Sequence, residues 1–174
     1  MTLSEFFNIV SELKKTQRKG WKEKVGIERP ESVADHSYGV SVMAMVYSDM
    51  ENLDTTKMLR MALLHDLAEA VTGDFIPGEI SRENKKVVES QAMEEILSKL
   101  PARLAETYSI LWKDYLECGS PEAALLHEVD KLEMAVQAAK YLGEGYQKER
   151  LEEFLESSRR EIKSKDLLAL LDTL

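Results

Sequence analysis

Apolar side chains recur every three or four positions through most of this chain, the spacing that places them on one face of an α-helix. The first predicted helix begins near Leu3 with Thr2 as its N-cap, and a loop over Gly20–Pro30 follows it. Blocks of alternating β-branched residues, which would indicate strands, do not occur. We therefore predict an all-α fold.

Start and stop signals divide the remainder of the chain into further helices. Ser32 is the predicted cap of a second helix, Thr55 or Thr56 opens a third, and the Gly and Pro residues of 72–78 break the pattern into a loop. Further helices are predicted over residues 81–100, 102–118, 120–143, 149–160 and 165–174. No repeat, low-complexity tract or linker interrupts them, so we expect a single domain over residues 1–174.

Composition fits a globular protein of this length. With 44% hydrophobic and 32% charged residues, the chain belongs neither to the disordered nor to the membrane-protein class. The N-terminal segment lacks the pattern of a signal peptide. Cys118 is the lone cysteine, which excludes an intrachain disulfide and a cysteine-based zinc site. We expect a cytoplasmic protein.

The net charge of −9 argues against a partner such as duplex DNA or RNA. The distribution is uneven, because residues 1–29 hold seven bases and four acids, a local charge of +3. From composition alone, a solvated helix face followed by a loop is the better explanation, and a basic lip for a small anion beside an acidic interior is the more specific alternative.

The candidate chemistry gathers around His65-Asp66 at the end of an apolar helix. Buried His and Asp need partners, and a divalent cation such as Mn, Fe, Co, Ni or Zn would supply the counter-charge. Hydrogen bonds from His65 to a carbonyl and from a loop amide to Asp66 would also satisfy the pair. Glu69 lies one turn after His65, and Asp74 follows in a glycine turn, so three carboxylates and an imidazole fall within ten residues. This density favours a metal site.

Other catalytic arrangements are missing from the sequence. His-Glu-x-x-His, Glu-x-x-His, Gly-x-Gly-x-x-Gly, the P-loop and the serine nucleophile elbow do not occur. Zinc proteases, ferritin-like di-iron proteins, P-loop nucleotide-binding proteins and α/β-hydrolases are therefore disfavoured.

The order His36, His65-Asp66, Asp130 resembles the H…HD…D signature of the HD-domain metal-dependent phosphohydrolase superfamily. The flanking segments are similar to the branch that contains HD-domain-containing protein 2 and the bacterial 5′-deoxynucleotidase, over nearly the whole chain to about residue 160. These segments are Arg18-Lys-Gly-Trp21, Arg29-Pro-Glu-Ser-Val-Ala-Asp-His36-Ser, Ala62-Leu-Leu-His65-Asp66-Leu-Ala-Glu69, Gly73-Asp74 with Pro77, and Asp130-Lys-Leu-Glu-Met.

The resemblance implies an HD-type helical bundle with a divalent metal held between helices by His36, His65, Asp66 and Asp130. It implies catalytic roles for Glu69 and Asp74, which in some relatives hold a further cation, and leaves Co, Mn, Fe, Zn and Mg open as the metal. Arg18 and Trp21 correspond to residues that bind the phosphate and the sugar of the substrate. The bacterial enzymes have this arginine and tryptophan adjacent, whereas here two residues intervene, as in the eukaryotic relatives.

The implied function is removal of phosphate from nucleoside 5′-monophosphates, most of all deoxyribonucleotides, by a homodimer. Two alternatives stay open at this point. One is hydrolysis of a cyclic nucleotide or alarmone by the same superfamily, and the other is a non-catalytic module that binds a nucleotide or a metal. We expect a small nucleotide as partner, and neither a polynucleotide nor a membrane.

Overall fold

The computed structural model describes residues 3–174, and the predicted cap Thr2 lies outside them. The described residues form α-helices and no named strand, which confirms the all-α prediction. The helices are α1 (Leu3–Glu12), α2 (Val33–Met50), α3 (Thr55–Leu64), α4 (Glu69–Thr72), α5 (Arg82–Leu97), α6 (Ala102–Glu117), α7 (Pro121–Gly143), α8 (Lys148–Glu161) and α9 (Lys165–Leu171).

One local prediction was wrong. The segment predicted as a loop after residue 20 contains a π-helical turn, Trp21–Val25, which ends at Gly26 with a positive φ of 87°. Burial of the Trp21 and Val25 side chains holds this turn against the rest of the molecule. The third helix begins at Thr55, which confirms the prediction, and it is capped by Asp54, whose carboxylate accepts the backbone N–H of Lys57 at 2.9 Å.

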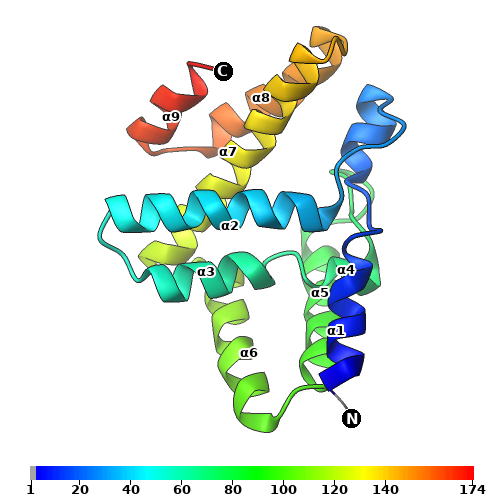
Figure 1. The fold of residues 1–174 in the computed structure, drawn as a ribbon, viewed down its shortest axis with the longest axis vertical. Helices are drawn as coiled ribbons and strands as arrows, with labels where there is room; N and C mark the ends of the chain where they lie inside the picture. Colours follow the sequence, from blue (N-terminus) through cyan, green and yellow to red (C-terminus); the bar gives the residue numbers. More distant parts are fainter. Residues whose placement is uncertain (1–2) are drawn as a thin grey trace.

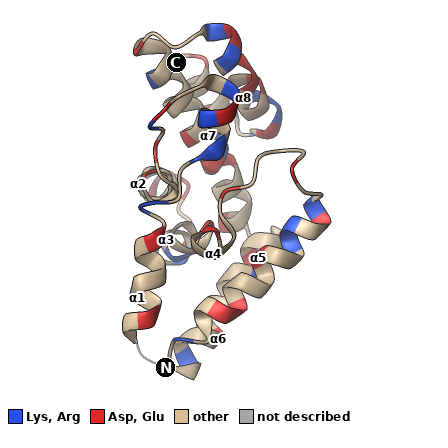
Figure 2. Cartoon of the chain, turned by 90° about the vertical axis from the view of Figure 1, so that its right-hand side faces the viewer, with Lys and Arg blue, Asp and Glu red and all other residues tan. Residues whose placement is uncertain are grey.

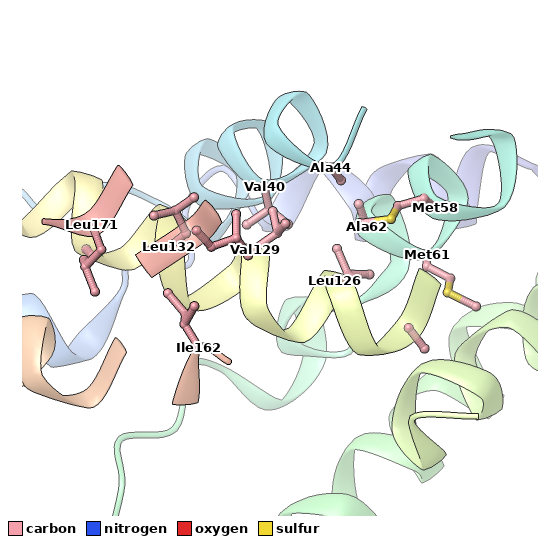
Figure 3. Packing of buried hydrophobic residues seen from close by; sticks show 13 residues of the cluster. Val40, Ala44, Met58, Met61, Ala62, Leu126, Val129, Leu132, Ile162 and Leu171 are labelled. Carbon is pink, nitrogen blue, oxygen red and sulfur yellow. The ribbon is translucent and has the colours of Figure 1, made fainter. Parts of the chain in front are cut away.

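Helices α2, α3 and α7 form the centre of the molecule (Figure 1). Their facing sides are filled by a cluster of aliphatic side chains that α8 and α9 complete at one end (Figure 3). Members of this cluster include Val40, Met58, Leu126, Val129, Leu132, Ile162 and Leu171. Burial of such side chains supplies the main stabilisation of this three-helix centre.

A second apolar cluster lies where α1, α4 and α5 pack together, with α6 contacting α5 (Figure 1). Trp112 belongs to it and is 5% exposed. The two clusters flank the end of α3 and the short α4. The His65-Asp66 pair and Glu69 lie in this region, between the two halves of the apolar interior.

Charged side chains are dispersed over the surface. On the side shown in Figure 2, acidic and basic residues alternate along α5 and α8 and do not form one continuous basic groove. Within residues 3–174, no helix combines the length and the apolar character that crossing a membrane requires.

Candidate metal centre and active site

His36 lies in the first turns of α2, where the Ser32–Asp35 capping box starts the helix. The ring is fully buried and both of its nitrogens face carboxylates. Nδ1 lies 2.5 Å from Glu133 Oε2, and Nε2 lies 3.1 Å from Asp130 Oδ1. Asp130 and Glu133 are one turn apart on α7, so α7 supplies both carboxylates to this histidine.

His65 and Asp66 follow α3 directly. Nδ1 of His65 donates to the Ala62 carbonyl at 2.7 Å, which leaves Nε2 free to point into the site. This Nε2 lies 3.2 Å from Asp66 Oδ2 and 3.4 Å from the Nε2 of His36. The hydrogen bond to a carbonyl that we considered in place of a metal is therefore present, and it orients the second nitrogen towards the other candidate ligands.

The arrangement fits a divalent cation. Ligand atoms that share an ion at about 2.1 Å lie roughly 3.0–3.4 Å apart. The separations within His36, His65 and Asp66 are close to this range, and so is that between His36 and Asp130. Oδ2 of Asp66 is buried and makes no hydrogen bond with the described residues, although two imidazole nitrogens face it. A cation would satisfy this oxygen and the two nitrogens at once.

The pKa shifts reflect the concentration of charge. Burial and Arg18 act to lower the pKa of His36, but hydrogen bonds with Asp130 and Glu133 outweigh them and raise it to about 10. Burial acts to raise the pKa of Asp66, but His65, His36 and Arg18 hold it well below its usual range. The neighbouring carboxylates thus favour the protonated form of the His36 ring.

Glu69 opens α4 one turn beyond His65 and is only 2% exposed. Burial, followed by repulsion from Asp66 and Asp74, raises its pKa well above the usual range. Oε2 makes no hydrogen bond with the described residues, while the Lys85 ammonium lies 3.8 Å from Oε1. The site thus holds a carboxyl that keeps its proton at a higher pH than an exposed glutamate does.

Arg18 brings positive charge to the same site from the N-terminal segment. Its guanidinium lies 3.7 Å from Asp66 and 3.8 Å from Asp74. Asp74 in turn accepts the backbone N–H of Lys19 at 2.5 Å, which fixes the glycine turn against this segment. An arginine that faces carboxylates at these long distances retains N–H groups that can bind a phosphate.

The structure therefore places ligand atoms of His36, His65 and Asp66 within 4.8 Å of one another, with Asp130 3.1 Å from His36. Arg18 lies between Asp66 and Asp74 at the same site, and Glu69 follows one turn after His65. The family model described as "HD domain" matches residues 10–169. The chain belongs to the HD domain family.

Relatives match this chain over most of their length. The chain is 35% identical to human 5′-deoxynucleotidase HDDC2, over 99% of this chain and 84% of that protein. It is 37% identical to the protein of that name from Dictyostelium discoideum, over 89% and 87% of the two chains. The crystal structure of the PH0347 protein from Pyrococcus horikoshii OT3 superimposes with a TM-score of 0.81 at 34% identity, covering 97% of this chain and 96% of that one.

Trp21 occupies a different environment from the other predicted residues of the HD site. Its indole is 1% exposed and stacks on Phe154 with ring centroids 4.1 Å apart. Tyr141 contacts it edge-on, and its Nε1–H donates to Glu31 at 2.8 Å. The structure places Trp21 beneath the surface of the N-terminal segment, and contact of this side chain with a sugar stays a prediction.

Sequence reasoning missed Glu31 and left the role of Glu133 open. The Glu31 carboxylate holds Trp21, and its backbone carbonyl accepts the N–H of Arg18 at 3.0 Å. One carboxylate oxygen of Glu31 and one of Glu133 both lie within 4.8 Å of a His36 ring nitrogen. The only signal in the sequence for Glu133 was its position one turn after Asp130.

Proposed function

We propose that this protein is a metal-dependent phosphomonoesterase that removes the phosphate from nucleoside 5′-monophosphates, with deoxyribonucleotides preferred. One observation carries the proposal. The Nε2 atoms of two histidines lie close together with an Asp66 oxygen that makes no hydrogen bond with the described residues, and Arg18 lies beside them. This site offers places for a cation and for an anionic ester side by side. The name 5′-deoxynucleotidase, carried by relatives along nearly the whole chain, supports the substrate class.

In this proposal His36, His65, Asp66 and Asp130 hold a divalent cation, either Co, Mn, Fe, Zn or Mg. Such an ion lowers the pKa of a bound water and polarises a phosphoryl oxygen. Glu69, whose pKa is raised, gives a proton to the leaving 5′-alkoxide or takes one from the attacking water. Asp74 orients Arg18 and assists Glu69, and these two carboxylates are the candidates for holding a further cation.

Arg18 forks onto two oxygens of the phosphate, a geometry that lysine cannot reproduce. Trp21 selects the sugar, either by direct contact or through Glu31. The indole N–H of Trp21 donates to the Glu31 carboxylate, and the Glu31 backbone carbonyl accepts the N–H of Arg18. Measuring kcat/KM for dAMP and AMP in an Arg18 variant and a Trp21 variant separates the two roles. Arg18→Ala removes a charge-assisted contact of about 1.5–3 kcal/mol, hence about ten- to a hundredfold in phosphate affinity. Trp21→Phe is expected to change mainly the ratio of dAMP to AMP turnover.

The remaining parts of the proposal concern assembly and location. We propose a homodimer of single HD domains spanning residues 1–174. Its support is the outer face of α2, which exposes apolar side chains along its length, among them Tyr38 at 73% exposure. The absence of a second cysteine to pair with Cys118 supports a cytoplasmic location. The net negative charge supports a small nucleotide rather than a nucleic acid as partner.

The test is phosphate release from a panel of ribo- and deoxyribonucleoside 5′-monophosphates, with a cyclic nucleotide and an alarmone included. The protein is stripped of metal and then resupplied separately with Co, Mn, Fe, Zn or Mg. We expect metal-dependent release from dAMP and its relatives at higher kcat/KM than from AMP. Turnover confined to the cyclic nucleotide or alarmone would contradict the proposal, as would nucleotide binding without release of phosphate.

A further inference from the structure

His36 can bind a cation through Nε2 only if its proton is kept on Nδ1. The acceptor for that proton is Glu133 Oε2 at 2.5 Å, and both side chains are buried. This distance is a hydrogen-bond length, too short for an ion between the two atoms, since each ligand would lie about 2 Å from the ion. The contact therefore orients the ring and fixes its tautomer.

The two candidate histidine ligands are fixed by different kinds of acceptor. His65 donates to the backbone carbonyl of Ala62, a neutral group that no side-chain substitution removes. His36 donates to a carboxylate, which adds negative charge behind the ring and makes Nε2 a better donor to a cation. Of the two acceptors, only the Glu133 carboxylate can be removed by a side-chain substitution.

Gly39 shows that the path of the Glu133 side chain is built into α2. A Cβ at residue 39 would lie 2.7 Å from Glu133 Oε1 and 3.0 Å from its Cγ. A glycine inside a helix costs about 1 kcal/mol relative to alanine, so this position weakens α2 locally. Glycine at residue 39 leaves room for the Glu133 side chain, which comes from α7. That side chain can then reach His36, which lies three residues before Gly39 in α2.

We propose that Glu133 is a positioning residue that presents Nε2 of His36 to the cation, and that Gly39 is required because it leaves room for Glu133. The proposal concerns cation binding by the metal centre and does not depend on which ester is hydrolysed. It assigns Glu133 no contact with the substrate.

The experiment measures cobalt affinity by competition with a chelator, together with the visible absorption spectrum of the bound cobalt. We expect Glu133→Ala to weaken binding about 10- to 100-fold. Gly39→Ala should weaken binding in the same direction, although alanine is the better helix former. Glu133→Gln retains an acceptor for the Nδ1 proton but not the charge, and is expected to fall between wild type and Glu133→Ala.

Gly143→Ala is the matched control, because this glycine also lies in a helix and a Cβ there meets no atom within 4 Å. Its cobalt affinity should equal that of wild type. In a double-mutant cycle, Gly39→Ala should have no further effect once residue 133 is alanine, a result that mere helix distortion would not give. Circular dichroism identifies any variant that fails to fold.

Wild-type affinity in folded Glu133→Ala would overturn the proposal. If Glu133→Ala does not fold, Gly39→Ala tests the proposal in its place. Wild-type cobalt affinity and an unchanged cobalt spectrum in Gly39→Ala would then overturn the proposal. Because the measured quantity is metal binding, a failed nucleotidase assay would leave this result standing, and the reverse also holds.

Discussion

Among single residues, Glu69 has the environment best suited to moving a proton. It is buried beside two other carboxylates, and one of its oxygens makes no hydrogen bond with the described residues. Burial and then the negative charges of Asp66 and Asp74 raise its pKa, so the proton stays on Glu69 at pH values where exposed glutamates have lost it. This proton is available to a leaving alkoxide.

Glu69→Gln removes the acid–base function but keeps the size of the side chain. We expect kcat for dAMP to fall by on the order of 10²-fold or more, as for other positioned acid–base groups. The cation held by the four predicted ligands should stay bound, because those ligands are intact. Phosphate release and elemental analysis of the same sample measure the two quantities. If turnover persists at the wild-type rate, the proton-transfer role passes to Asp74, which Asp74→Asn then tests.

At the level of helices, the junction between α3 and α7 depends on Glu122. Its carboxylate accepts the backbone N–H of Asp54 at 3.2 Å and the ammonium of Lys57 at 3.1 Å. Burial acts to raise the pKa of Glu122, but the backbone hydrogen bonds and Lys57 outweigh it and lower the pKa. The ionised form is therefore the one that stabilises the fold.

A lowered folded-state pKa gives stability that is present above the unfolded value near 4.5 and is lost as the pH falls through the folded value. Glu122→Gln should therefore reduce the free energy of unfolding by about 1 kcal/mol at pH 7. The difference between variant and wild type should shrink towards zero below pH 4. Urea unfolding of both proteins at pH 7 and below pH 4 measures this difference in the free energy of unfolding. An equal difference at the two pH values would show that the charge of Glu122 is not what matters.

The helices could be predicted from the sequence because apolar periodicity is a local signal. The set His36, His65, Asp66 and Asp130 came from the resemblance of their order to the HD signature, and its role as a set of metal ligands stays a prediction. The role of Glu133 could not be decided, because spacing shows only that it shares a face with Asp130. Burial of Trp21 depends on Phe154 and Tyr141, which are remote in sequence and join only when α8 packs on α7.

For the molecule as a whole, the outer face of α2 is the feature that suggests assembly. Tyr38, Val42, Met45, Val46 and Met50 are exposed along it, while the opposite face packs into the core. A helix that is apolar on both faces is typical of a buried element, and a second copy of the chain would cover the exposed face. The symmetric pairing of one surface patch with itself is the commonest form of oligomer.

Val46→Glu places a charge in the middle of this face. We expect wild type to be a dimer and this variant to be a monomer with unchanged helical content, measured by light scattering after size-exclusion chromatography and by circular dichroism. Val87→Glu is the control, because this valine is also exposed but lies on α5. A monomeric wild type would contradict the homodimer, and dissociation of both variants would show that α2 is not its interface.

The burial of Glu69 beside Asp66 and Asp74 has a consequence for engineering. Burial and repulsion from these two acids oppose ionisation of Glu69, and its Oε2 makes no hydrogen bond with the described residues, so substitutions at Glu69 are candidates for improving heat resistance. A library selected for thermal survival alone would enrich such changes and lose the acid–base group of the proposed reaction. The same library selected for phosphate release would retain Glu69, so the choice of screen decides whether the stabilised protein still turns over substrate.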